Sequence, residues 1–109
     1  MLTGAEIKRR FPTLTAVEVY DTIGSTNTRA IELARAGTPG IALVLSDGQS
    51  CGRGRVSRPF YSPPGTGIYL TLLIRPRVTP DLLPRLTPLA AVATAEAIEA
   101  VADVRVGVK

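Results

Sequence analysis

Hydrophobic residues recur along the chain at spacings that predict alternating helices and strands. Thr3 and Glu6 have the spacing of a capping box, which predicts a short helix over residues 3–11. Pro12 ends this helix, because the residue before a proline avoids helical geometry. The apolar residues that follow favour a strand over residues 16–22.

A second helix is expected directly after this strand. Ser25, Thr26 and Asn27 are residue types that cap helix N-termini, and an apolar stripe of helical period follows them. Gly37 has the position of a helix C-terminal glycine. The uninterrupted apolar run over residues 41–45 then predicts a buried strand.

The second half of the chain begins with a segment that lacks an apolar pattern. Residues 47–66 are rich in glycine, proline and arginine and are expected to form a long loop. A strand is predicted over residues 67–75. Thr87 is expected to cap a third helix with Pro88 at its first position, and residues 104–109 alternate as a strand does.

Leu89, Val92 and Ile98 are expected on the buried face of this third helix. The order of elements indicates an α+β fold, in which a mixed sheet is flanked by helices. The 109 residues suit one domain, and their composition is that of a globular protein.

The absence of histidine excludes histidine catalysis and histidine metal ligands. The single cysteine excludes an intrachain disulfide, which fits the reducing cytoplasm. We find no signal peptide at the N-terminus and no apolar run long enough to span a membrane. A cytoplasmic location with no membrane partner is therefore the expectation.

The chain has a net charge of +4, and the clustering of its arginines in one short segment indicates an anionic ligand. Arg53, Arg55 and Arg58 cluster in a segment without acidic residues, and glycines at 52 and 54 allow the backbone to approach an anion. Arginine side chains bind carboxylate or phosphate with paired donors. Spacing alone leaves a ligand-binding loop and a solvated basic loop equally open.

Two nucleotide-binding motifs are excluded, since no third glycine and helix follow this loop and no Gly-Lys-Ser/Thr occurs in the chain.

Three motifs in order resemble those of biotin protein ligases. The first is the upstream Ser25-Thr26-Asn27. The second is the loop Gly52-Arg53-Gly54-Arg55, followed by Arg58, Phe60, Ser62-Pro63, Gly65 and Tyr69. The third is the predicted strand from Val104 to Lys109, which resembles the strand that ends in the lysine of the family's Lys-Trp-Pro-Asn-Asp motif. The family commonly has tryptophan where this chain has Phe60, which implies weaker stacking there.

The resemblance implies the α+β fold of biotin and lipoate protein ligases, which is similar to that of class II aminoacyl-tRNA synthetases. Residues 1–109 would be the N-terminal part of the catalytic domain, incomplete at the C-terminus, without a winged-helix DNA-binding domain or a C-terminal domain in this chain. Nucleic-acid binding is therefore not expected, and a homodimer is left open.

The implied activity is the ATP-dependent conversion of biotin to biotinyl-5′-AMP, followed by transfer to a lysine of a biotin carboxyl carrier protein. ATP and biotin are the substrates and Mg²⁺ the accompanying ion, with no metal ligand assigned to the protein. The implied catalytic residues are Arg55 and Lys109. The implied biotin contacts are Ser25, Thr26, Asn27, Gln49, Gly52, Arg53, Arg55 and Lys109. The implied nucleotide contacts are Arg53, Arg55, Arg58 and Phe60.

Three other functions compete with this interpretation. A lipoate-type ligase has a similar fold, but the Gly-Arg-Gly-Arg sequence favours the biotin branch. An inactive truncated fragment that only binds a ligand is the second, since the chain stops at Lys109 and is expected to be inactive alone. A basic nucleic-acid-binding module is the third, and the scattered charges outside the loop disfavour it.

Overall fold

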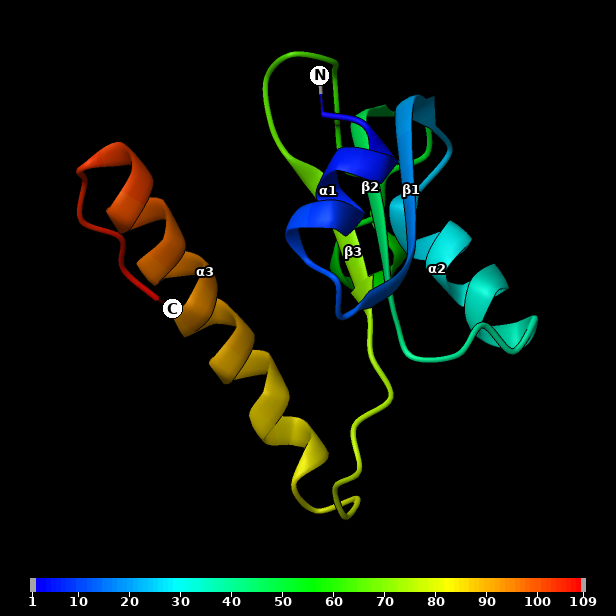
Figure 1. Cartoon of the computed structure of the whole chain (residues 1–109). Coiled ribbons are helices and arrows are strands. Elements are labelled where there is room, and N and C mark those ends of the chain that lie inside the picture. Colours follow the sequence, from blue (N-terminus) through cyan, green and yellow to red (C-terminus); the bar gives the residue numbers. More distant parts are fainter. Residues whose placement is uncertain (1, 109) are drawn as a thin grey trace. The chain divides into compact units, whose positions relative to one another are not determined.

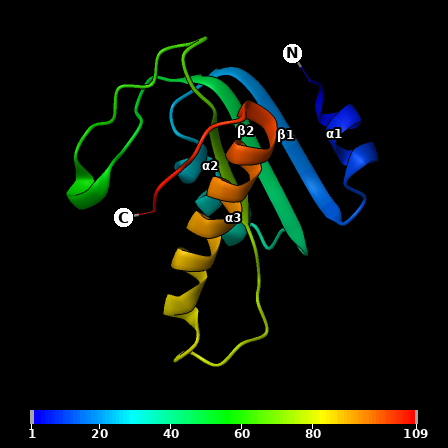
Figure 2. The ribbon, with the colours of Figure 1, turned by 90° about the vertical axis from the view of Figure 1, so that its left-hand side faces the viewer.

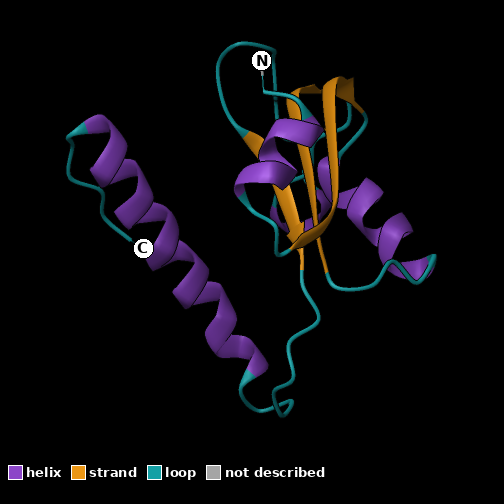
Figure 3. Ribbon diagram, viewed as in Figure 1, coloured by secondary structure: helices purple, strands orange, loops and turns teal. Residues whose placement is uncertain are grey.

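The computed structural model describes residues 2–108, without the side chain of Ser57. These residues divide after Arg75 into two compact units. The first unit contains α1 (Gly4–Arg10), β1 (Leu14–Ile23), α2 (Thr26–Arg35), β2 (Ile41–Gln49), a 3₁₀ turn (Arg55–Ser57) and β3 (Tyr69–Leu73) (Figure 1). The second unit contains a 3₁₀ turn (Leu83–Arg85) and α3 (Leu86–Ala102) (Figure 3).

The three strands form one mixed sheet in the order β1-β2-β3. β1 and β2 are parallel, with α2 as the crossover between them, and β3 is antiparallel to β2. The register places Glu18 and Thr71 on either side of Val44. Because paired residues point to the same face of a sheet, these three side chains share one face. The predicted mixed sheet with flanking helices is confirmed.

The two helices of the first unit lie on opposite faces of this sheet. Gly4 of α1 lies against Val17, whereas Arg29 of α2 bonds to Glu18, and neighbouring strand residues point to opposite faces. Figure 2 shows α1 beside β1. The core lies between α2 and the sheet and consists of Ala30, Leu33, Ala42 and Val44.

Local signals explain how the helices begin and end. The Thr3–Glu6 capping box is present at α1, and the Ser25 side chain accepts a hydrogen bond from the Thr28 N–H at the start of α2. Gly37 follows α2 with φ of 80°, a left-handed conformation that favours glycine. Arg75 donates to the carbonyl oxygens of Ala34, in the last turn of α2, and of Thr38, just beyond it.

The glycine-rich segment is more ordered than the sequence predicts. β2 continues to Gln49, and isolated bridges join Gln49 to Ser62 and Arg53 to Pro59. Residues 50–61, here termed the Gly-Arg loop, therefore fold back on themselves. β3 is correspondingly shorter than the predicted 67–75. The sequence pattern missed these bridges because single backbone pairings leave no periodic pattern of apolar residues.

Two predictions for the second unit are wrong. Thr87 does not cap α3, because the preceding 3₁₀ turn runs directly into the helix and Arg85 occupies the cap position without a side-chain bond. The predicted strand at 104–109 is not formed in residues 104–108, which pair with no described strand. Asp103, the residue before this segment, has a left-handed backbone conformation. Alternation alone does not make a strand, since its backbone needs a partner. Lys109 lies outside the described residues.

The second unit by itself does not bury the predicted face of α3. Leu89, Val92 and Ile98 are 64%, 45% and 43% exposed, and within the described part of α3 only Ala95 is buried. A stripe of apolar residues is buried only where another element packs on it. Although α3 is apolar, none of the helices within residues 2–108 is both long and apolar enough to cross a membrane.

Candidate ligand-binding site

A pocket of about 180 Å³ lies at the N-terminus of α2, where β2 and β3 meet the Gly-Arg loop. We term it the polar pocket. Its lining combines residues from four separate parts of the chain, which are Ser25, Thr26, Asn27, Gln49, Arg53, Phe60, Ile68, Tyr69, Leu70 and Thr71. The sheet register brings these parts together.

Hydrogen bonds connect the polar side chains of this pocket. Gln49 Oε1 accepts from the Thr26 backbone N–H at 2.8 Å and from Thr26 Oγ1 at 3.1 Å. Thr26 Oγ1 lies 2.9 Å from Thr71 Oγ1, which donates to Asn27 Oδ1. Thr26 is buried, so its hydroxyl needs these partners. The part of the pocket wall formed by Thr26, Asn27, Gln49 and Thr71 is thus preorganised by hydrogen bonds among its own side chains.

The other end of the Gln49 amide holds the Gly-Arg loop. Gln49 Nε2 donates to Ser62 Oγ at 3.1 Å, and Ser62 Oγ donates to the Phe60 carbonyl oxygen at 3.1 Å. Gly52 lies against these groups, so closely that a β-carbon there would meet the Phe60 oxygen at 2.7 Å. The close approach requires glycine at position 52.

The polar pocket favours a ligand that carries partial or full negative charge. α2 points the N–H groups of its first turn at this end, and it has no acidic residue in that turn. Arg53 adds a full positive charge to the lining. Peptide dipole and guanidinium therefore act in the same direction.

The structure brings together most of the predicted site residues. Six of them line the polar pocket, namely Ser25, Thr26, Asn27, Gln49, Arg53 and Phe60, and Gly52 supports it from the loop. Arg55 and Arg58 do not line it and are exposed near the tip of the Gly-Arg loop. Lys109 is outside the described residues.

Between those two arginines lies Val56, which is 90% exposed and has φ of 58° and ψ of 39°. This left-handed conformation is strained for a β-branched residue.

Thr71 is a pocket residue that the sequence reasoning missed. It contacts both Thr26 and Asn27, and Tyr69 of the same strand donates its hydroxyl to the Pro63 carbonyl oxygen at 3.1 Å. The available signal was a single polar residue in the otherwise apolar run Tyr69–Leu73. A polar side chain in such a run faces either solvent or a site.

A larger apolar groove of about 500 Å³ adjoins the polar pocket. It runs between α2 and β3, and the two hollows share Asn27 and Thr71. Its other lining residues are mainly aliphatic, namely Ala30, Ile31, Ala34, Arg35, Leu72 and Leu73. Together, the hollows offer polar contacts at one end and apolar surface at the other.

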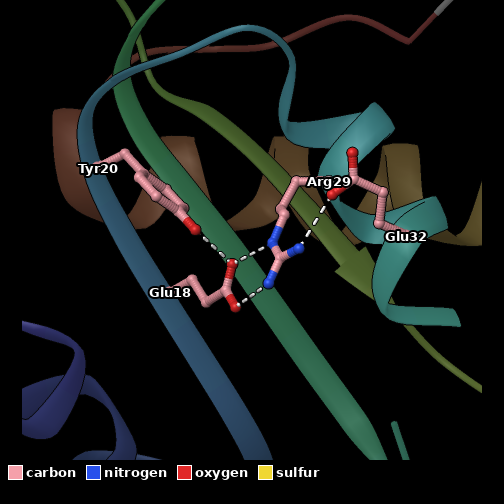
Figure 4. Close-up of polar contacts among 4 residues, drawn as sticks. All are labelled: Glu18, Tyr20, Arg29 and Glu32. Carbon is pink, nitrogen blue, oxygen red and sulfur yellow. Dashed lines mark hydrogen bonds and ion pairs between the residues drawn. The ribbon is translucent and has the colours of Figure 1, made fainter. Parts of the chain in front are cut away.

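A cluster of ionisable side chains lies on the β1 side of α2 (Figure 4). Arg29 Nε and Nη2 donate to the two carboxylate oxygens of Glu18 at 2.7 and 2.9 Å, and Arg29 Nη1 donates to Glu32 Oε2 at 2.9 Å. The Tyr20 hydroxyl donates to Glu18 Oε1 at 2.6 Å. The hydrogen bonds from Arg29 lower the pKa of Glu18, and the bond to Glu18 raises the pKa of Tyr20.

No metal site is evident in the part of the chain that the structure describes. Within residues 2–108, no group of three or more histidine, cysteine, aspartate or glutamate side chains is placed to hold a metal ion.

Fold and site together define a class of protein: an α+β domain with a polar pocket formed by a helix N-terminus, strand ends and a glycine-arginine loop. No protein-family model matches the chain. Two curated relatives do, both named bifunctional ligase/repressor BirA.

The relative from Bacillus spizizenii is 44% identical over 89 residues, and that from Bacillus subtilis is 40% identical over 90 residues. These matches cover 82% and 83% of this chain, but only 27% and 28% of the relatives, so the chain spans about a quarter of their length.

Solved structures show the same likeness. The biotin protein ligase from Leishmania major in complex with biotinyl-5-AMP is 26% identical, with a TM-score of 0.65 over 80% of this chain and 35% of that one. Its complex with biotin is 25% identical, with a TM-score of 0.62 over 78% and 34%. The resemblance inferred from the motifs is therefore confirmed: the chain is similar, over most of its length, to one segment of biotin protein ligases.

Proposed function

We propose that this chain is part of an ATP-dependent biotin–protein ligase. The observation that carries the proposal is the pairing of the polar pocket with the adjoining apolar groove. Biotin has a polar ureido ring and an aliphatic chain that ends in a carboxylate, and the polar pocket with Arg53 and the apolar groove together offer polar, cationic and apolar contacts. The similarity to structures solved with biotin and biotinyl-5-AMP supports the same ligand.

Gln49 and the first turn of α2 would bind the polar ring. Oε1 of Gln49 already accepts two hydrogen bonds from Thr26, and Nε2 uses one proton for Ser62. The second Nε2 proton remains to donate to a carbonyl oxygen of the ligand. Ser25, Thr26 and Asn27 would contribute the remaining polar contacts.

The proposed reaction has two steps. The carboxylate of biotin attacks the α-phosphorus of ATP, so that an acyl–phosphate bond forms and pyrophosphate leaves. The deprotonated amine of an acceptor lysine then attacks the acyl carbon and displaces AMP. The acceptor would be a lysine of a biotin carboxyl carrier protein.

Positive charge is what the first step requires, because two anions must meet. Arg53 is placed at the pocket, and Arg55 and Arg58 would reach the phosphates once the Gly-Arg loop covers the ligands. Lys109 would contact the carboxylate and the phosphate. Mg²⁺ would enter as the complex with ATP, and it would neutralise part of the phosphate charge there.

We further propose that residues 1–109 are the N-terminal part of the ligase catalytic domain and that the enzyme works in the cytoplasm. Both proposals rest on the order of the motifs and on the relatives that the chain matches.

The test is biotin binding by calorimetry and biotin-dependent pyrophosphate exchange, both with the full-length protein. Gln49→Ala should weaken biotin binding by roughly five- to a hundredfold, because loss of a neutral group that leaves its hydrogen-bond partners unsatisfied costs about 1–3 kcal/mol. Ser50→Ala is the matched control, since Ser50 is an exposed neighbour outside the pocket. Exchange that depends on lipoate rather than biotin, or a folded protein that binds neither, would refute the proposal.

A further inference from the structure

The pair Glu18 and Arg29 links the first turn of α2 to β1 (Figure 4). α2 packs mainly on β2 and β3, and the β1 residues Ala16, Tyr20 and Ile23 border the same core, so the pair adds a directional polar contact to this apolar packing. Both carboxylate oxygens of Glu18 are engaged by the guanidinium, and Tyr20 adds a third bond to the same carboxylate. A bidentate pair fixes orientation as well as distance, so α2 cannot roll about its axis without breaking it.

This link lies one helical turn from the polar pocket. The Arg29 backbone N–H donates to the Ser25 carbonyl oxygen at 3.1 Å, so both residues belong to the same turn. Thr26, three residues before Arg29 and on the same face of the helix, bonds to Gln49 of β2 and Thr71 of β3. The N-terminus of α2 is therefore held at two points, by the pocket side chains and by β1.

The Glu18–Arg29 pair contributes more to the placement of the α2 N-terminus than to the free energy of folding. The side chains of Arg29 and Glu18 are 34% and 26% exposed. An ion pair with this degree of exposure to water contributes only about 0–1 kcal/mol to folding. A binding site, in contrast, loses affinity when its side chains shift by about half an ångström.

We propose that Glu18 and Arg29 are positioning residues that set the orientation of Ser25, Thr26 and Asn27 in the polar pocket. The proposal rests on the proposed function, because it assumes that this pocket binds the biotin ring. Removal of the pair lets the first turn of α2 rotate, so the ligand loses contacts while the fold persists.

Glu32 provides a matched control for this pair. It accepts from the same guanidinium at 2.9 Å and also carries a carboxylate, but it lies on α2 itself. Glu32→Gln therefore removes a contact of Arg29 without loosening the link to β1. Its side chain is 57% exposed, and the substitution should leave the pocket unchanged.

The experiment compares Glu18→Gln, Arg29→Lys and Glu32→Gln in the full-length protein. For Glu18→Gln we expect the KM for biotin to rise about fivefold or more while the KM for ATP stays within about twofold, the signature of lost binding at one ligand. Arg29→Lys keeps the positive charge but loses the two parallel donors that bind both carboxylate oxygens, and its effect should be smaller than that of Glu18→Gln. Hydrogen exchange of the Thr26 and Thr28 amides, measured without ligand, should accelerate more in Glu18→Gln than in Arg29→Lys.

The outcomes separate this proposal from the proposed function. If the wild-type protein binds no biotin, the proposed function fails, and faster exchange at Thr26 still decides whether the pair holds the helix. If wild type is active but Glu18→Gln and Arg29→Lys match Glu32→Gln in biotin KM and in Thr26 exchange, positioning is overturned. A lowered melting temperature with an unchanged biotin KM would show a merely structural pair and would also overturn it.

Discussion

A methyl group added at Gly52 tests how firmly the Gly-Arg loop is joined to the polar pocket. A β-carbon there would lie 2.6 Å from Ser62 Oγ, 2.7 Å from the Phe60 carbonyl oxygen and 2.9 Å from Gln49 Nε2. The carbonyl oxygen belongs to the backbone and cannot rotate away. At Gly54 in the same loop, the nearest atom would be 3.7 Å away, so Gly54→Ala is a matched control for folding.

The structure sets the magnitude of the effect of Gly52→Ala. If the loop stays closed, overpacking costs about 1–3 kcal/mol. If the loop opens instead, it loses the bond from the Phe60 N–H to the Gly52 oxygen and the bond from Gln49 to Ser62. Each is worth roughly 1 kcal/mol, so opening costs about 2 kcal/mol. The two routes are similar, and we expect a destabilisation of about 2 kcal/mol, or roughly thirtyfold in the opening equilibrium.

The assay is amide hydrogen exchange at Phe60, followed residue by residue with and without biotin. In Gly52→Ala this amide should exchange roughly thirtyfold faster than in the wild type, and in Gly54→Ala within about threefold of it. Biotin affinity should fall together with the lost protection. Equal protection of the Phe60 amide in both variants would show that the loop does not depend on the contact at Gly52, which would refute the reasoning.

Substitutions at three other positions test separate parts of the site and its support. Ser25→Ala should lower the free energy of unfolding in urea by about 1 kcal/mol through loss of the helix cap, and Ser25→Gly by only a few tenths; equal losses would contradict a capping role. Because Arg29 lowers the pKa of Glu18, the charged form of Glu18 stabilises the fold. The difference in the free energy of unfolding between wild type and Glu18→Gln should therefore be present well above pH 4.5 and shrink as the pH falls below 4.5. A gap in the urea midpoint that is unchanged at acidic pH would exclude this linkage. In the full-length enzyme, Arg55→Ala should shorten the lifetime of the bound adenylate roughly ten- to a hundredfold, from a lost contact of about 1.5–3 kcal/mol; an unchanged lifetime in a single-turnover hydrolysis assay would remove Arg55 from the covering loop.

Those parts of the fold that depend on neighbours in sequence were predictable. The capping box at Thr3, the cap at Ser25 and the glycine after α2 act within one helical turn, and each was found where the sequence places it. The strand pattern also gave the mixed sheet. Most pocket residues followed from the resemblance to biotin protein ligases rather than from spacing.

Apart from the start of α3, where a 3₁₀ turn replaces the expected cap at Thr87, the features that the sequence did not reveal depend on pairing between segments that are not adjacent in the chain. Thr71 joins the pocket only because β3 pairs with β2 in one register, which aligns it with Val44. Glu18 and Arg29 are eleven residues apart, and no local periodicity relates a strand to the helix that crosses it. The supposed strand at 104–108 failed for the same reason, since it has no described partner.

The order in which the pocket residues occur in the chain has a consequence for synthesis on the ribosome. Thr26 and its partner Thr71 are 45 residues apart. At about 5–20 residues per second, roughly 2–9 s pass between their additions to the growing chain. During this interval β1, α2 and β2 can already assemble, whereas the hydroxyl of Thr26 still lacks its partner on β3. A nascent chain should therefore acquire affinity for a ligand of the polar pocket only after β3 has emerged, so ligand capture would mark the completion of this sheet.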